Sequence, residues 1–236
     1  MRRPQPRRSS GALSATIGIS LLAAAADAGR LAFADAAFRA GGTTGGSSAS
    51  ALACRAGRCA AGGFPLEAEA LARAAAAAAP RRSSLRVLHG SLLAGLGREA
   101  EAREEWESAF ALDPMRAPVA RLAAAAALAR YRESGDSREI ERAVARLRIA
   151  NLAEPSGVKE GIFLLHAHGA DPLLLRSCVP DHPEARLCAG QAFLDLGMPG
   201  AAAAELSQAV GCGKPEKREE LLERAALLLE HSRRAP

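Results

Sequence analysis

SSLRVLHGSLLAGLGREAEAREEWESAFALDPMR, at residues 83–116, is the stretch that decides the fold. Its first half carries leucines at helical spacing and runs to Gly97, and its second half runs to Pro114. Glycine commonly follows the last residue of a helix, and proline cannot continue one. We therefore expect one helix over about 85–96, a turn at Gly97 and a second helix over about 99–111.

Landmarks of this stretch recur along the chain at fixed intervals. Each landmark of an earlier unit returns 34 residues later (97−63, 102−68, 114−80): Gly63, Ala68 and Pro80 become Gly97, Ala102 and Pro114. A further copy lies 100 residues downstream (197−97), where Gly190, Gly197 and Ala202 repeat Gly90, Gly97 and Ala102. A 34-residue period is typical of repeated helix-turn-helix units. The pattern predicts an all-α solenoid of antiparallel helix pairs.

The best unit resembles the tetratricopeptide repeat (TPR) family. The matching residues are Gly90, Leu93, Gly97, Ala102, Trp106, Ala109, Phe110, Leu112, Asp113 and Pro114. The resemblance is strongest over 83–116 and 183–215, and it is weaker over 49–82, 117–157 and 157–182. It implies that Gly90 and Ala102 are small where two helices cross, and that Trp106 faces the next repeat. Gly190, Gly197 and Ala202 have the same structural roles in the later unit.

Composition divides the chain into three parts. We expect a basic arm with an apolar signal or anchor helix at 1–40, a flexible linker at 41–50 and a TPR-like repeat domain at 51–236. The last stretch, 217–234, alternates charged and apolar residues. It is expected to be the capping helix that a solenoid needs at its end.

The arm has the features of an export segment. Arginines precede an uncharged run from Ser9 to Ala26, and an Ala-x-Ala site follows within 24–28. Three hypotheses stay open: a cleaved signal peptide, a retained membrane anchor with contact through residues 9–28, and a soluble helix. With the Arg- and Ala-rich composition, the first two predict a bacterial cell-envelope protein, either anchored in the inner membrane and facing the periplasm or exported. The third predicts a cytoplasmic protein.

Charge argues against a nucleic-acid partner. The net charge is +5, but six arginines and two aspartates in residues 1–40 account for +4 and leave +1 for residues 41–236. Aromatic residues make up only 3% of the chain. A nucleic-acid interface needs a concentrated basic surface and often stacking aromatics. We therefore expect protein or peptide partners and no nucleic acid.

Little in the sequence indicates catalysis. His166, His168 and Asp171 are the one set that resembles metal ligands, and they define an alternative function as an accessory or metal-dependent hydrolase. On a helix, however, residues two apart diverge by about 200°. No nucleophile elbow, zinc-protease motif or phosphate loop is present. We expect a protein that is not an enzyme and needs no cofactor.

The cysteines do not form a recognised motif. The five residues are Cys54, Cys59, Cys178, Cys188 and Cys212, and none of them forms a C-x-x-C pair. We expect small buried residues with free thiols. In an exported protein, the last three could instead form a disulfide in some combination.

The TPR resemblance implies a concave groove lined by the first helix of each pair. Groove positions in the two best units are Val87, Leu88, Ser91, Ala94, Leu187, Gln191 and Leu194. Their small and apolar side chains predict an apolar groove that binds a peptide or helix, although any single position could instead belong to the core. The expected function is a TPR-type scaffold, membrane-anchored or exported, with a soluble cytoplasmic TPR adaptor as the alternative.

Overall fold

The structure is a computed structural model that describes residues 48–234, and within this range the regular structure is entirely helical. The predicted arm at 1–40, its apolar helix and most of the linker lie outside the described residues. The chain divides into two compact units, Met1–Ala79 and Pro80–Pro236. The single domain predicted over 51–236 stays a prediction, and the two units are described separately below.

The first unit contains one helix pair, α2 (Ala49–Ala61) and α3 (Pro65–Ala78). Ser48 begins α2, because its hydroxyl oxygen accepts a hydrogen bond from the backbone N–H of Ala51 at 3.2 Å. The buried side chains of the pair are mostly alanines: Ala53, Ala56, Ala68, Ala72, Ala75 and Ala76. Side chains this small allow the two helix backbones to pack closely.

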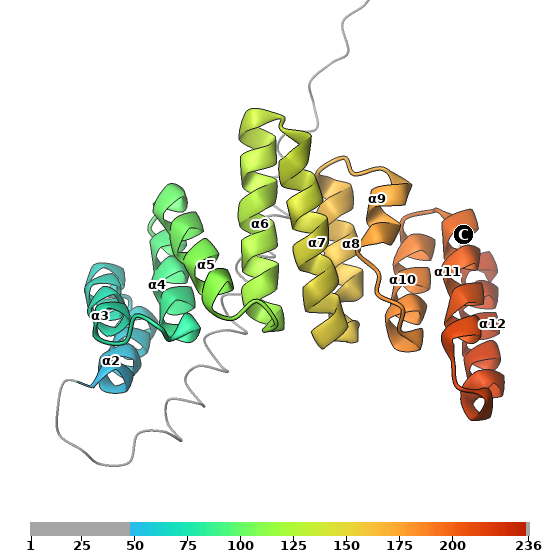
Figure 1. The fold of residues 1–236 in the computed structure, drawn as a ribbon, viewed down its shortest axis with the longest axis horizontal. Coiled ribbons are helices and arrows are strands. Elements are labelled where there is room, and N and C mark those ends of the chain that lie inside the picture. Colours follow the sequence, from blue (N-terminus) through green and yellow to red (C-terminus); the bar gives the residue numbers. More distant parts are fainter. Residues whose placement is uncertain (1–47, 235–236) are drawn as a thin grey trace, which may run out of the picture. The chain divides into compact units, whose positions relative to one another are not determined.

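The second unit contains four helix pairs and a final single helix (Figure 1). The pairs are α4 (Ser83–Gly95) with α5 (Glu99–Leu112), α6 (Ala117–Ser134) with α7 (Ser137–Ala153), α8 (Val158–Ala167) with α9 (Pro172–Ser177), and α10 (Pro183–Asp195) with α11 (Pro199–Cys212). Short 3-10 turns at Pro155–Gly157 and Pro215–Lys217 precede α8 and the last helix, α12 (Arg218–Arg234). α12 packs against α10 and α11 at the position predicted for the capping helix.

Helix bounds repeat in register across three of the pairs. The bounds of α2 and α3, moved by 34 residues, are the bounds of α4 and α5 (83−49, 95−61, 99−65, 112−78). Moved by a further 100 residues, they are the bounds of α10 and α11 (183−83, 195−95, 199−99, 212−112). The weak sequence unit at 49–82 therefore folds like the strong ones. α6 also begins 34 residues after α4 (117−83), but α6 and α7 are longer, at 18 and 17 residues.

The same turn joins the helices of four pairs. Gly63, Gly97, Gly169 and Gly197 have φ angles of 80°, 77°, 77° and 70°. At each turn, the N–H of the next residue donates to a carbonyl five residues earlier, as in Arg98 to Leu93 at 2.9 Å and Met198 to Phe193 at 2.8 Å. These contacts satisfy carbonyls that the helix end would leave unpaired. Glycine is required because other residues rarely adopt this left-handed conformation.

A second glycine in the first helix allows close crossing. A Cβ placed on Gly90 would lie 2.7 Å from Nε1 of Trp106 and 3.1 Å from the carbonyl oxygen of Ala102. A Cβ on Gly190 would lie 2.5 Å from Cδ2 of Leu206. The large residue of α5 or α11 thus covers the glycine of its own pair. Trp106 also packs with Ala126 of α6, so it contacts the next repeat as well.

Candidate partner-binding surfaces

The α4 positions predicted for the groove are partly accessible. Val87, Leu88, Ser91 and Ala94 are all half-buried. Ala94 packs against the cluster that contains Leu93 and Trp106, so part of its surface belongs to the core. A binding role for these four positions stays a prediction.

Of the α10 positions predicted for the groove, Leu187 belongs to the core and Leu194 stays partly accessible. Leu187 is only 3% exposed and packs with Leu206 and with Leu221 of α12. Leu187 is covered by α12, so it does not belong to the candidate surface. Leu194 is half-buried and packs against the large core cluster formed by α6 to α11.

The remaining accessible surface of α10 is polar. Glu184, Cys188, Gln191 and Asp195 follow one another at helical spacing and form one stripe. Glu184 accepts two hydrogen bonds from Arg224 of α12, at 2.8 and 3.0 Å. At the other end of the stripe, Asp195 accepts a hydrogen bond from Gln191 at 2.7 Å. The α10 stripe therefore consists of charged, amide and thiol side chains, and Leu194 is the apolar α10 position of the predicted groove that stays partly accessible.

An ion pair connects α8 to the same stripe. Nζ of Lys159 lies 2.7 Å from Oδ2 of Asp195 and 5.7 Å from the ring centroid of Phe163. We name the surface formed by Lys159, Phe163, Glu184, Cys188, Gln191, Asp195 and Arg224 the α8–α10–α12 face. Its two cations and two carboxylates balance, and the stripe extends over the full length of α10.

Ionisation on this face follows its contacts. Hydrogen bonds from Arg224 lower the pKa of Glu184. Burial opposes ionisation of Asp195, but hydrogen bonds from Lys159 and Gln191 outweigh it and lower the pKa of that carboxyl group. Burial, followed by the negative charges of Glu184 and Glu160, raises the pKa of the Cys188 thiol. At neutral pH the face therefore presents fixed charges around an un-ionised thiol.

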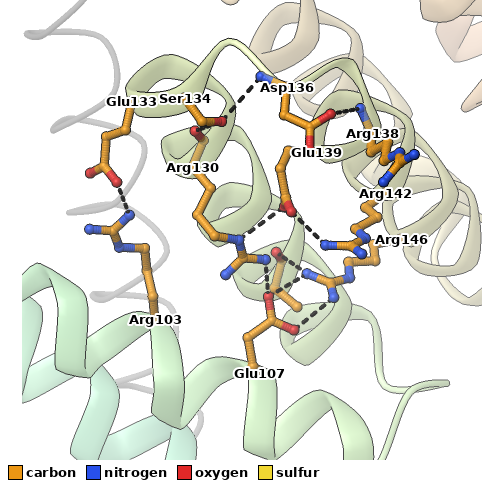
Figure 2. Close-up of polar contacts among 11 residues, drawn as sticks. Arg103, Glu107, Arg130, Glu133, Ser134, Asp136, Arg138, Glu139, Arg142 and Arg146 are labelled. Carbon is orange, nitrogen blue, oxygen red and sulfur yellow. Dashed lines mark hydrogen bonds and ion pairs between the residues drawn. The ribbon is translucent and has the colours of Figure 1, made fainter.

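A network of charged side chains joins α5, α6 and α7 (Figure 2). Glu107 accepts hydrogen bonds from both terminal nitrogens of Arg146, each at 2.7 Å, and another from Arg130. Arg130 also donates to Glu139 at 2.9 Å, and Arg142 donates to the same carboxylate. Figure 2 shows these side chains converging from three helices. The network fixes how two successive pairs pack, and its charges are largely satisfied within it.

Burial opposes ionisation of Glu107, yet hydrogen bonds from Arg146 and Arg130 outweigh it and lower the pKa of this carboxyl group. Arg146 is held by two further contacts: a hydrogen bond to the carbonyl of Ala123 at 2.8 Å, and the ring of Phe110 at 5.0 Å. The carboxylate is thus held charged at a junction between helices.

An ion pair that was not predicted from the sequence recurs in the two best repeat units. Arg86 donates to Glu105 at 3.1 Å between α4 and α5, and Arg186 donates to Glu205 at 2.6 Å between α10 and α11. The two pairs are 100 residues apart at both ends (186−86, 205−105). An alignment of units 83–116 and 183–215 that also compared their charged residues would have revealed both pairs. His89 of α4 is also buried, with its Nδ1 3.3 Å from Oε1 of Glu105.

The histidines considered as metal ligands have other surroundings. His166 is exposed, and Nδ1 of His168 lies 2.9 Å from the carbonyl oxygen of Leu164. Asp171 begins α9, because its carboxylate accepts a hydrogen bond from the N–H of Leu174 at 2.9 Å. Within residues 48–234, no group of three His, Cys, Asp or Glu side chains is placed to hold a metal ion.

The cysteines differ in exposure, and all five have free thiols. Cys178 is buried, and burial raises the pKa of its thiol to about 12. Cys54, Cys59 and Cys188 are half-buried and Cys212 is exposed, so the prediction of burial is wrong for Cys212. Its position at the end of α11, beside the turn to α12, leaves it open to solvent.

Among the helices described, none combines the length and the apolar character needed to span a bilayer. Residues 9–28, for which membrane contact was predicted, lie outside the described residues.

The fold is similar to that of a solved TPR protein. A thermophilic TPR protein of Thermus thermophilus aligns with a TM-score of 0.44 and 20% sequence identity, over 77% of this chain and 99% of that one. No protein-family model matches the sequence, and no curated protein matches it. The helix bounds and turns of the chain itself define its class, a protein built from TPR-like helix-turn-helix repeats.

Proposed function

We propose that this protein is a non-enzymatic scaffold that binds a segment of a partner protein along the α8–α10–α12 face. The observation that carries the proposal is the stripe on α10, where polar side chains remain accessible between two neighbouring helices. Repeat proteins present extended surfaces of this kind because each repeat contacts only its neighbours. An extended or helical partner segment matches such a surface better than a small molecule does.

The chemistry of the face is suited to reversible binding. Its ion pairs, Glu184 with Arg224 and Lys159 with Asp195, are partly exposed. Exposed pairs contribute only about 0–1 kcal/mol each, so a partner's charges can replace them at small cost. The half-buried ring of Phe163 adds apolar surface at the edge of the face. A partner segment with charges of both signs around an apolar residue would complement this arrangement.

Site-specific photocrosslinking tests this proposal. Gln191, on the face, is replaced by benzoylphenylalanine in the full-length protein, and the exposed Ala203 of α11 is replaced in a matched control. Irradiation of cells that express each variant should give a discrete adduct with one partner from position 191 and none from position 203. An absence of adducts at position 191, or the same adducts at both positions, would contradict the proposal.

We also propose that residues 9–28 attach the repeats to the membrane of a bacterial cell envelope. Support comes from the basic segment, the uncharged run and the Ala-x-Ala site of the arm. Fractionation should find the full chain in the membrane fraction and a chain lacking residues 1–40 in the cytosol, whereas a chain that is exported and shortened at its N-terminus would favour a cleaved signal peptide. A full chain that is cytosolic and retains Met1 would instead favour the soluble adaptor.

A further inference from the structure

A hollow lies beside α9, the shortest α-helix of the second unit. α9 has 6 residues, whereas α5 and α11, the second helices of two other pairs, have 14 each. Figure 1 shows this short helix and the irregular connection that leads from it to α10. The hollow is shallow and open to solvent, with a volume of about 300 Å³. It is lined by Arg148, Leu173, Arg176, Ser177, Val179, Asp181, Arg186, Glu205 and Gln208.

The base of the hollow is a buried carboxylate held by two arginines. The side chain of Glu205 is only 1% exposed and accepts hydrogen bonds from Arg176 and Arg186, each at 2.6 Å. Arg186 also donates to Asp181, and this hydrogen bond lowers the pKa of Asp181. Glu205 is therefore engaged by both arginines, and Asp181 by Arg186 alone. Together, these two carboxylates hold Arg176 and Arg186 in place and neutralise them.

A third guanidinium group makes no hydrogen bond to a carboxylate of the described residues, although its positive charge contributes to lowering the pKa of Asp181. Arg148 of α7 is exposed, and its hydrogen bond in the hollow is to the backbone carbonyl of Ser177 at 3.5 Å. Three arginines against Asp181 and Glu205 leave the hollow with a charge of +1. A carbonyl contact at that length is weak, so a carboxylate could take its place with little loss.

An aliphatic surface adjoins this charge. Leu173 of α9 is 73% exposed at the rim, and Val179 is buried below it. Leu173 can pack against an apolar side chain of a ligand while Arg148 binds an acidic group of the same ligand. The hollow is open to solvent, so a polypeptide segment can lie across it.

We propose that this hollow binds a protein segment in which a glutamate or aspartate lies beside an aliphatic residue. Arg148 binds the carboxylate, and Leu173 packs against the aliphatic side chain. This site is separate from the α8–α10–α12 face, because Arg186 projects about 200° around α10 from Glu184. The proposal therefore adds a second contact surface, with a defined ligand chemistry, to the proposed scaffold.

Fluorescence polarisation of the full chain tests the proposal with a fluorescein-labelled peptide, Gly-Gly-Leu-Glu-Leu-Glu-Gly, and its counterpart with glutamine at both glutamates. The acidic peptide should bind, and more tightly at low ionic strength because exposed charges are screened by salt. The glutamine peptide should bind about tenfold more weakly, as expected when a charge-assisted hydrogen bond is lost. Failure of the acidic peptide to bind, or equal binding of both peptides, would overturn the proposal.

Variants locate the binding. Arg148→Ala should weaken binding of the acidic peptide about fivefold to tenfold, and Leu173→Ala should also weaken it. Arg138→Ala is the control, because it removes the same charge from an exposed position of the same helix. Equal effects of Arg148→Ala and Arg138→Ala would show a general charge effect and refute the site. The result is independent of crosslinking at Gln191, so either proposal can fail alone.

Discussion

Replacement of Gly90 by alanine tests whether close helix crossing defines the repeat. The new Cβ would lie 2.7 Å and 2.8 Å from Nε1 and Cδ1 of Trp106, which is 5% exposed. Approaches this short force the indole ring to move, and overpacking of this kind costs about 1–3 kcal/mol. Alanine is better than glycine in a helix by about 1 kcal/mol, which offsets part of this cost. We expect Gly90→Ala to destabilise the second unit by about 0–2 kcal/mol in total.

The same helix provides a matched control. Gly95 also lies in α4, and a Cβ there would have no atom within 4 Å. Gly95→Ala should therefore keep only the gain in helix propensity and stabilise the protein by about 0.5–1 kcal/mol. Urea unfolding followed by circular dichroism would compare the two variants. Because both variants gain helix propensity, their free energies of unfolding should differ by the overpacking cost, about 1–3 kcal/mol.

Two further measurements isolate the cause. Trp106 is the only tryptophan of the chain, so a shift in fluorescence emission of Gly90→Ala reports the displaced indole directly. In a Trp106→Ala background the ring is absent, and Gly90→Ala should cost much less than in the natural chain. If Gly90→Ala were as stable as Gly95→Ala, or if its cost persisted without Trp106, the close-crossing argument would be refuted.

Three other predictions concern charge and thiols. The pKa of Glu107 is lowered in the folded chain, so its contribution to stability is complete above the unfolded pKa of about 4.3 and is lost as the pH falls. Glu107→Gln should therefore lower the free energy of unfolding by about 1–2 kcal/mol at pH 7 and flatten the decline of stability toward acid pH in urea titrations. An unchanged decline would argue against the network. Glu205→Gln should cost about 3 kcal/mol and Glu105→Gln about 1 kcal/mol in thermal or urea unfolding, because the side chain of Glu205 is 1% exposed and that of Glu105 is 22% exposed; equal costs would contradict this ranking. Brief maleimide labelling of the folded chain at pH 8 should modify Cys212 and leave Cys178 unmodified, since Cys178 is buried and its pKa is raised to about 12; rapid labelling of Cys178 in peptide mass spectrometry would show that its surroundings are open.

The helix pairs could be predicted from local signals. Gly97 and Gly197 end helices through a backbone conformation that only glycine adopts readily, and the prolines that follow the second helices stop them. Such signals act within a few residues, so they are readable in one sequence. They predicted α4 and α5 within about two residues, and the same interval indicated the weaker pair α2 and α3.

Contacts between distant residues were decided by the tertiary structure. Leu187 matched a groove position in the sequence, but α12 packs over it and makes it part of the core. The ion pairs across the α8–α10–α12 face join residues 36 and 40 positions apart (195−159, 224−184), so no local pattern contains them. The hollow at Arg148 likewise brings together residues of α7, α9, α10 and α11, which lie far apart in the sequence. Glycine, proline and periodic apolar residues act locally and therefore determined the helices and their pairing. Burial and charge pairing depend on which surfaces meet, and only the packed chain decides that.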